Sequence, residues 1–173
     1  VCVWQKKEMG EIYIIQSKKE EAFLRKKVPA VDLKEESKKS LKELVKKMRQ
    51  VMKKSNGVGL SANQFGVAKR LFVAGVPDEK AQMKFYAFLN PEIVKTAGEK
   101  KVLEEGCLSV PGEYGLVERS YRVTLEGYTI EGKKVKVKAW GLLAHVFQHE
   151  VDHLNGKLFI DKAKKRFKMG AKK

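Results

Sequence analysis

The sequence predicts an α+β fold in which antiparallel β-sheets pack around a central helix. Residues 141–156 (GLLAHVFQHEVDHLNG) have helical length and are mostly apolar, yet they carry several ionisable groups. Residues 32–55 have an apolar stripe at helical spacing, and residues 70–140 alternate strand-like runs with turn residues. Because the chain has 173 residues and 43% hydrophobic content, we expect one domain spanning residues 1–173.

The N-terminal segment is expected to form a strand followed by a loop. Residues 11–16 (EIYIIQ) are rich in β-branched and aromatic side chains, which favour a strand. Residues 17–31 are highly charged and contain Pro29, which disfavours a long regular element. The prediction for residues 17–31 is therefore a charged loop.

The next element is a predicted helix over residues 32–55. Asp32 and Glu35 have the spacing of a capping box at the start of a helix. The dipeptide Asn56-Gly57 is typical of a helix end. The apolar stripe of this N-terminal helix consists of Leu41, Leu44, Val45, Met48 and Met52.

Five segments in the middle of the chain have the composition of strands. They are residues 70–76, 84–91, 101–112, 116–130 and 133–140. Turns are expected at Pro77-Asp78 and at Glu131-Gly132. In the last segment Val135, Val137 and Ala139 alternate with lysines, which predicts one buried face and one solvated face.

Residues 157–173 are a basic C-terminal tail with eight Lys or Arg residues and one aspartate. Phe159, Ala163, Phe167 and Gly170 recur at roughly helical spacing, which predicts a short basic amphipathic helix. A frayed, solvated tail is an equally compatible interpretation. The net charge of +16 favours polyanionic surroundings such as nucleic acid, the ribosome or an anionic membrane, although a lysine-rich soluble surface has the same composition.

Composition also bears on the cellular compartment. The sequence lacks a run of roughly 18 apolar residues, so no membrane span and no membrane partner are expected. The N-terminal residues lack the basic and apolar segments of a secretory signal. Cys2 and Cys107 are too few for a disulfide framework in a chain of this length. We therefore expect a cytoplasmic protein whose cysteines are free or bound to metal.

The late helix carries a group of side chains suited to metal chemistry. His149 and His153 are four residues apart and lie on one helix face, with Glu150 beside them. Two imidazoles so placed can bind one divalent metal, and the carboxylate can handle the proton of a water molecule. Buried histidines with ordinary hydrogen bonds are the alternative, but a buried His-Glu-x-x-His pattern is unusual without a ligand.

His145 lies on the same face, so the pair of ligands has to be chosen. His145 and His153 are roughly 12 Å apart along a helix axis, too far to bind one ion. The pair is therefore His145 with His149 or His149 with His153. We favour the second pair because Glu150 then falls inside the motif.

The glycine-containing segment at residues 57–66 (GVGLSANQFG) is expected to carry an amide side chain into a site. It lacks the spacing of phosphate-binding and dinucleotide-binding loops, which makes a nucleotide site a weak interpretation. Gln64 is the side chain that such a loop would present. An exposed glutamine in a turn is the alternative.

A metal site with two histidines needs a third protein ligand. No histidine or glutamate follows His153, so the third ligand is sought earlier in the chain. Cys107, within residues 105–109 (EGCLS), is the candidate, and a turn there can bring its sulfur and the Leu108 amide together. A small buried hydrophobic role is the alternative for a free cysteine.

Three segments together resemble the signature motifs of the peptide deformylase family. They are residues 57–64 (GVGLSANQ), 105–109 (EGCLS) and 148–156 (QHEVDHLNG), in the order found in that family. The resemblance implies a metal-dependent hydrolase that removes the formyl group from N-formylmethionine of nascent polypeptides and releases formate. The metal is implied to be natively Fe(II), with Zn, Ni or Co as replacements.

The resemblance also implies roles for individual residues. Cys107, His149 and His153 correspond to metal ligands, and Glu150 corresponds to the general base and acid. The Gln64 amide and the Leu108 backbone amide correspond to donors that stabilise the oxyanion. The substrate-binding candidates are Gly59, Leu60, Gly106, Tyr114, Leu142, His145 and Val146.

Some positions depart from the family pattern. Tyr114 replaces an arginine seen in some members, and His145 stands where many have an apolar or basic residue. Ser61 replaces the usual alanine, a change expected to have little chemical effect. Asp152 and Arg119 are expected either to form a pair that orients a ligand or to form an ordinary surface salt bridge.

The implied partners are N-formylmethionyl peptides and, through the basic tail, ribosomal RNA. The candidate RNA contacts are Lys164, Lys165, Arg166 and Lys168. A zinc peptidase with the same helix motif is a second interpretation, disfavoured by the missing downstream ligand. A non-catalytic RNA-binding or ribosome-binding protein is a third, and only the positive charge supports it.

Overall fold

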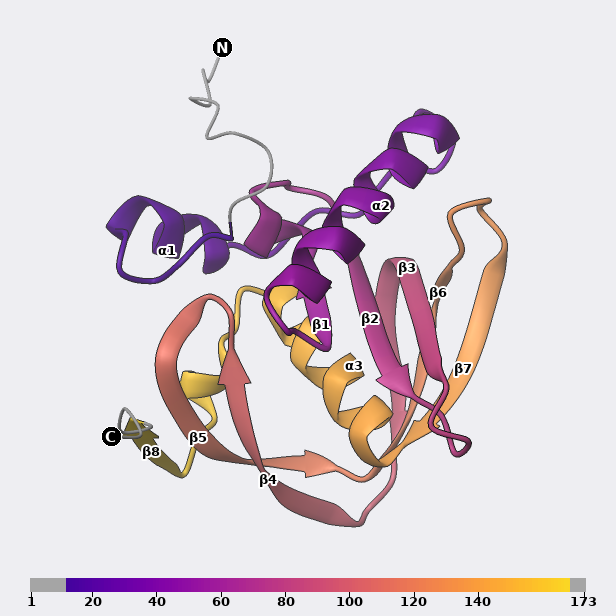
Figure 1. Ribbon diagram of the computed structural model, residues 1–173. Coiled ribbons are helices and arrows are strands. Elements are labelled where there is room, and N and C mark those ends of the chain that lie inside the picture. The colour runs from indigo at the N-terminus through magenta and orange to yellow at the C-terminus, as the bar shows by residue number, and fades with distance from the viewer. Residues whose placement is uncertain (1–11, 169–173) are drawn as a thin grey trace.

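The computed structural model describes residues 12–168, which form two antiparallel sheets and three α-helices (Figure 1). The larger sheet has the order β1-β2-β3-β6-β7, formed by Gly59–Ser61, Leu71–Pro77, Met83–Thr96, Arg122–Tyr128 and Lys134–Trp140. The smaller sheet has the order β4-β5-β8, formed by Lys100–Cys107, Val110–Ser120 and Lys165–Lys168. The predicted α+β class with antiparallel sheets is therefore confirmed.

Helix α3 (Gly141–Leu154) lies between the two sheets in Figure 1. Phe147 is fully buried and packs its ring against Phe72 and Phe88, with ring centroids 5.7 and 5.5 Å away. Gln148 links α3 to the smaller sheet, because its side-chain amide both accepts a hydrogen bond from and donates one to the backbone of Ser120 at the end of β5. Helix α3 is thus held between the sheets by apolar packing and by a side-chain amide.

The C-terminal end of α3 is set by a glycine. Gly156 follows the helix with a φ of +73°, a conformation that side chains rarely adopt. A Cβ at this position would also collide with the carbonyl of Arg25. The sequence Asn155-Gly156 therefore ends α3 where the chain passes close to the N-terminal segment.

Helix α2 (Lys38–Lys54) starts later than predicted. Its N-cap is Ser37, whose hydroxyl accepts a hydrogen bond from the Ser40 amide, whereas the Asp32 carboxylate accepts one from the Lys34 amide in a separate turn. The predicted start at Asp32 is therefore wrong, but the stripe is confirmed. Its residues join a core cluster that includes Leu41, Met48, Met52, Leu60, Leu71 and Leu89, with Leu44 and Val45 packed against it.

Both predictions for the N-terminal segment, a strand followed by a loop, are wrong. Residues 12–16 form no strand and are tied down by single backbone bonds, from Tyr13 to the Gln64 carbonyl and from Ile15 to the Ser109 carbonyl. The predicted loop contains helix α1 (Lys18–Leu24), because Ser17 caps it and Leu24 is fully buried. Residue 11 lies outside the described residues.

The predicted strand at 116–130 is two strands in different sheets. The chain leaves the smaller sheet at the end of β5, bends at Tyr121 and enters the larger sheet as β6. The segments at 70–76, 84–91, 101–112 and 133–140 contain the expected strands, although β3 extends to Thr96. The turn at Glu131-Gly132 is confirmed, with Gly132 at a φ of +86°.

The predicted C-terminal helix is wrong. A short 3-10 turn at Phe159–Asp161 is followed by β8, which pairs antiparallel with β5. Phe167 stacks on Tyr114 across that pair, with ring centroids 6.3 Å apart. A spacing of four residues suits a strand face as well as a helix face, so the pattern alone could not separate them. Gly170 lies outside the described residues.

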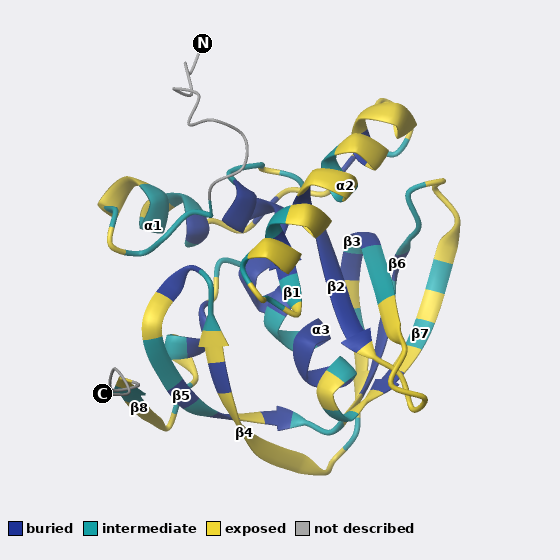
Figure 2. Cartoon of the chain, viewed as in Figure 1, coloured by how far each residue is buried: buried dark blue, intermediate teal, exposed yellow. Residues whose placement is uncertain are grey.

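Burial follows this arrangement (Figure 2). Helix α3 and strand β2 are largely buried, while the outward faces of α2 and β7 are exposed. The alternation predicted for Val135, Val137 and Ala139 is confirmed, because the lysines between them are exposed. Within residues 12–168, no helix is both long and apolar enough to cross a membrane.

Candidate metal centre and active site

Three potential metal ligands meet where the end of β4 faces α3. The Cys107 sulfur lies 3.1 Å from Nε2 of His153, and the same nitrogen lies 3.1 Å from Nε2 of His149. The three donor atoms all lie within 4.8 Å of one another. The structure therefore brings together the cysteine and the histidine pair selected from the sequence, and His145 is not a member of this group.

The donor set fits a divalent transition metal. One thiol and two imidazoles are ligands that zinc and iron accept, and three protein ligands leave a position open. Nδ1 of His149 lies 2.9 Å from Oε2 of Glu105, so Nδ1 carries a proton, and Nε2 faces Cys107 and His153. Nδ1 of His153 is buried and has no hydrogen-bond partner within the described part of the chain.

The two histidines differ in proton affinity. Burial lowers the pKa of His153 well below its ordinary value, so its ring is neutral and can donate a lone pair. Burial also works to lower the pKa of His149, but contacts with Cys107 and Glu105 outweigh it and raise that pKa well above its ordinary value. Binding of a metal by His149 would therefore displace a proton from its ring.

Glu105 is a buried carboxylate that contacts His149 on the side of the ring opposite the candidate metal position. Burial works to raise its pKa, but hydrogen bonds from Arg119, His145 and His149 outweigh it and hold the pKa well below the ordinary value. Arg119 is also bonded to Asp152 at 2.7 Å and is only 5% exposed. The predicted pair of Asp152 and Arg119 is thus present and buried, so the surface salt bridge interpretation is wrong.

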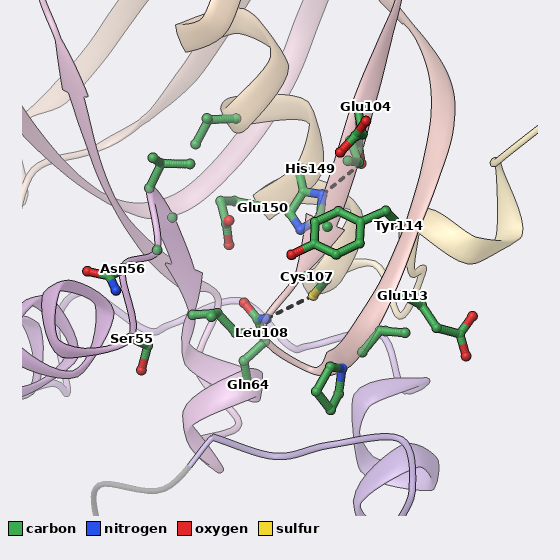
Figure 3. A pocket seen from close by; sticks show the side chains of 18 of the residues that line it. Ser55, Asn56, Gln64, Glu104, Cys107, Leu108, Glu113, Tyr114, His149 and Glu150 are labelled. Carbon is green, nitrogen blue, oxygen red and sulfur yellow. Dashed lines mark hydrogen bonds and ion pairs between the residues drawn. The ribbon is translucent and has the colours of Figure 1, made fainter. Parts of the chain in front are cut away.

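Glu150 lies beside the candidate ligands and faces the same cavity (Figure 3). Burial raises the pKa of its carboxyl to about 6. The Ser61 hydroxyl donates a hydrogen bond of 2.7 Å to Oε2 of Glu150. Gly59 leaves room for this carboxylate, because a Cβ at that position would collide with it. Ser61, expected to matter little, therefore contacts a central side chain of the site.

Gln64 is buried, so the alternative of an exposed turn glutamine is wrong. It lies in a 3-10 turn (Ala62–Phe65) directly after β1. Its carbonyl oxygen accepts a hydrogen bond from the Ser61 amide at 3.0 Å. Its NH₂ group consequently points the other way, 3.4 Å from the Cys107 sulfur (Figure 3). It also lies 3.1 Å from the Ser109 hydroxyl. The amide is held with its donor hydrogens towards the Cys107 sulfur and the Ser109 hydroxyl.

A cavity of about 490 Å³ opens onto this group of side chains. Most of the substrate-binding candidates line it, namely Gly59, Gly106, Tyr114, Leu142, His145 and Val146. Leu60 does not, because its side chain points from β1 into the core and is fully buried. The assignment of the Leu60 side chain to the cavity is therefore corrected.

Several contributors could not be identified from the sequence. The sequence indicates no role for Glu105 or Ser109, and it predicts little chemical effect for Ser61. Each acts through contacts with residues tens of positions away, such as the 44 positions that separate Glu105 from His149. The one local indication that Glu105 belongs to the site is its position two residues before Cys107.

The fold and site define a class of metal-dependent hydrolase, in which a Cys-His-His donor set and a glutamate face a cavity. A family model for polypeptide deformylase matches residues 12–169. The chain belongs to the peptide deformylase family, whose members remove the N-formyl group from nascent polypeptides. The interpretations as a zinc peptidase or a non-catalytic RNA-binding protein are therefore set aside.

Individual relatives agree with this assignment. The chain is 48% identical to a peptide deformylase of Halothermothrix orenii over 119 residues, which cover 69% of this chain and 75% of the relative. It is 46% identical to one of Rhizobium meliloti over 121 residues, 70% of each chain.

Solved structures extend the comparison to the fold. A class I type b peptide deformylase from Acinetobacter baumannii matches with a TM-score of 0.81 at 33% identity, covering 90% of this chain and 99% of the other. The Thermotoga maritima peptide deformylase matches with a TM-score of 0.79 at 34% identity, covering 91% and 99%.

Proposed function

We propose that Cys107, His149 and His153 hold one divalent metal, natively Fe(II), which Zn, Ni or Co can replace. The observation that carries this proposal is the convergence of one sulfur and two Nε2 atoms within 4.8 Å. When bound, the ion supplies Lewis acidity, which lowers the pKa of water and polarises the formyl oxygen. We assign the reaction to a single catalytic domain spanning residues 1–173.

Glu150 is proposed as the proton carrier of the reaction. Its carboxylate accepts a proton as water adds to the formyl carbon, and returns it to the nitrogen as the carbon–nitrogen bond breaks. The products are formate and a free N-terminal amine. A carboxyl pKa of about 6 suits both steps, because a group that titrates near the working pH can accept and release a proton.

Gln64 and Leu108 are proposed to stabilise the negative charge that develops on the formyl oxygen. The bond between the Gln64 carbonyl and the Ser61 amide fixes the direction of the NH₂ group, so one of its hydrogens can exchange the Cys107 sulfur for the oxyanion without rotation of the side chain. Leu108 follows Cys107 directly and lines the cavity, which places its backbone N–H beside the proposed ligand.

Removing the Gln64 donor is expected to slow turnover without removing metal. Gln64→Ala should lower kcat about 10²–10³-fold, the usual effect of losing one oxyanion donor. The measurement is steady-state release of formate from formyl-Met-Ala-Ser, with bound metal per chain determined in parallel. A kcat within about threefold of the wild-type value would remove Gln64 from this role.

The cavity is proposed to bind the formylmethionyl end of a peptide. Leu142 and Val146 supply apolar surface for the methionine side chain, next to His145. Gly59, Gly106 and Tyr114 are proposed to lie along the peptide backbone. A structure of the Acinetobacter enzyme bound to Met-Ala-Ser, which matches this chain with a TM-score of 0.80 at 32% identity, supports the binding of a short peptide by this fold.

The test of this function compares three peptides. The metal-loaded protein is expected to release formate from formyl-Met-Ala-Ser, to leave acetyl-Met-Ala-Ser intact and to leave unformylated Met-Ala-Ser intact. Cleavage of peptide bonds in the unformylated peptide would instead favour a peptidase. Absence of any hydrolysis by protein with one bound metal would overturn the catalytic proposal.

We also propose that the protein works in the cytoplasm and contacts ribosomal RNA through the basic residues of β8 and the preceding turn. Lys164 and Arg166 are paired with Glu118 and Glu113. Lys165 and Lys168 are exposed and have no ion pair within the described residues, so they remain available for phosphate groups.

The expected result is weaker ribosome binding when these two charges are reversed. Lys165→Glu with Lys168→Glu should lower co-sedimentation with ribosomes several-fold, with the largest difference at low salt. Formate release from a free peptide serves as the control for folding. Unchanged co-sedimentation of a variant that retains peptide turnover would contradict ribosome contact through this strand.

A further inference from the structure

A second histidine shares the carboxylate that holds His149. His145 lies one helical turn before His149 on α3, and its Nε2 is 2.6 Å from Oε1 of Glu105. His149 uses the other oxygen of that carboxylate, at 2.9 Å. Glu105 is 4% exposed, so water cannot readily replace a lost donor. One buried carboxylate therefore joins two histidines from successive turns.

The hydrogen-bonding capacity of Glu105 is filled. An ionised carboxylate has about four acceptor positions. Oε1 accepts from Nε of Arg119 and lies 2.6 Å from Nε2 of His145, while Oε2 accepts from Nη2 of Arg119, at 2.9 Å, and from His149. With all positions occupied, the carboxylate has one orientation in which every donor is satisfied. That orientation sets the plane and the tautomer of the His149 ring.

His145 has its polar contact at this carboxylate. Its Nδ1 is buried and has no hydrogen-bond partner among residues 12–168. Its Nε2 must carry the hydrogen of the bond to Glu105 whether the ring is neutral or charged, because a carboxylate can only accept. Leu142 and Val146 line the same cavity but have no polar side-chain atoms. The contribution of His145 can therefore be separated from that of the cavity wall.

We infer that His145 is a positioning residue for the metal centre, holding Glu105 so that His149 presents Nε2 to the ion. This inference rests on the proposed role of His149 as a ligand. Without His145, Oε1 of Glu105 keeps only Arg119 as a partner, so the orientation in which the carboxylate also reaches His149 is less constrained. Residues that directly orient a ligating histidine change metal affinity by about 10–100-fold. His145 acts on His149 through Glu105, so we expect its loss to weaken metal binding by about tenfold, the lower end of that range.

The test measures zinc affinity of the metal-free protein by competition with a chromophoric chelator. His145→Leu is expected to bind zinc about tenfold more weakly, because leucine has no donor. His145→Gln, which can place an N–H near the position of Nε2, should recover affinity to within about threefold of wild type. Leu142→Ala, a change in the same cavity wall, should keep wild-type zinc affinity.

A second readout separates positioning from packing. In cobalt-substituted protein, His145→Leu is expected to alter the visible ligand-field bands while the thiolate-to-cobalt band persists, because the imidazole moves and the sulfur stays. Melting of the metal-free variants reports packing alone. A lowered melting temperature combined with wild-type zinc affinity and wild-type cobalt bands would overturn the inference. So would a failure of His145→Gln to recover affinity when its metal-free stability equals that of wild type.

The same assay distinguishes failure of this inference from failure of the proposed ligand set. If Cys107→Ala loses zinc while His145→Leu binds like wild type, the ligands stand and the role of His145 is refuted. If Cys107→Ala binds zinc like wild type, the ligand set itself is refuted, and the role of His145 falls with it.

Discussion

Glu150→Ala is expected to retain one metal per chain and to lose turnover. Glu150 lines the cavity beside the three converging donors but is not one of them. Proton transfer by a positioned side chain contributes about 10²–10⁴-fold to rate, and Glu150 is proposed to act in two steps. We therefore expect kcat to fall by about 10⁴-fold, the upper end of this range. Formate release from formyl-Met-Ala-Ser and metal content of the same preparation are the measurements.

Glu150→Gln is the matched variant for this prediction. The amide has nearly the same shape and can still accept a hydrogen bond from Ser61, but it cannot take up the proton. It should lose turnover as alanine does. Loss of metal in both variants would instead make Glu150 a ligand. Turnover within tenfold of wild type would require another proton carrier.

Cys107→Ala is expected to give the largest loss of metal affinity. The thiol is one of three donors, and its removal leaves two imidazoles that cannot complete the site. Even residues that only support a ligand change affinity by about 10–100-fold, so the loss here should exceed about 100-fold. Metal-binding competition and metal content after dialysis measure it.

Cys107→Asp provides the graded comparison. A carboxylate oxygen can replace the sulfur as a donor, so this variant is expected to keep metal with an altered preference and altered turnover. Wild-type metal preference together with wild-type turnover would count against Cys107 as a ligand. The pair of variants thus separates loss of a donor from a change in its chemistry.

The sequence contained most of the information about the reacting groups. His149, Glu150 and His153 are local to one helix, so their common face follows from helical geometry alone. Cys107 is indicated by the need for a third ligand and Gln64 by its glycine-containing loop, and the resemblance of three motifs supports placing both beside the helix. Contacts that support the proposed ligands, such as the one between Glu105 and His145, depend on how β4 packs against α3. No local sequence pattern specifies that packing.

Fold predictions failed where two structures share one pattern. Phe159, Ala163 and Phe167 are spaced by four, which suits the face of a helix and the face of a strand equally. Residues 116–130 look like one continuous strand, and the bend at Tyr121 depends on the two sheets that the chain must join. Helix α1 was missed because a seven-residue helix leaves a weak periodic signal.

The most direct test of the metal centre is X-ray absorption at the metal edge of the loaded protein. The predicted coordination shell contains one sulfur and two imidazole nitrogens, with zinc distances of about 2.3 and 2.0–2.1 Å. Cys107→Ala should remove the sulfur contribution from whatever metal remains. A shell of nitrogen and oxygen atoms alone in the wild-type protein would contradict the proposed centre.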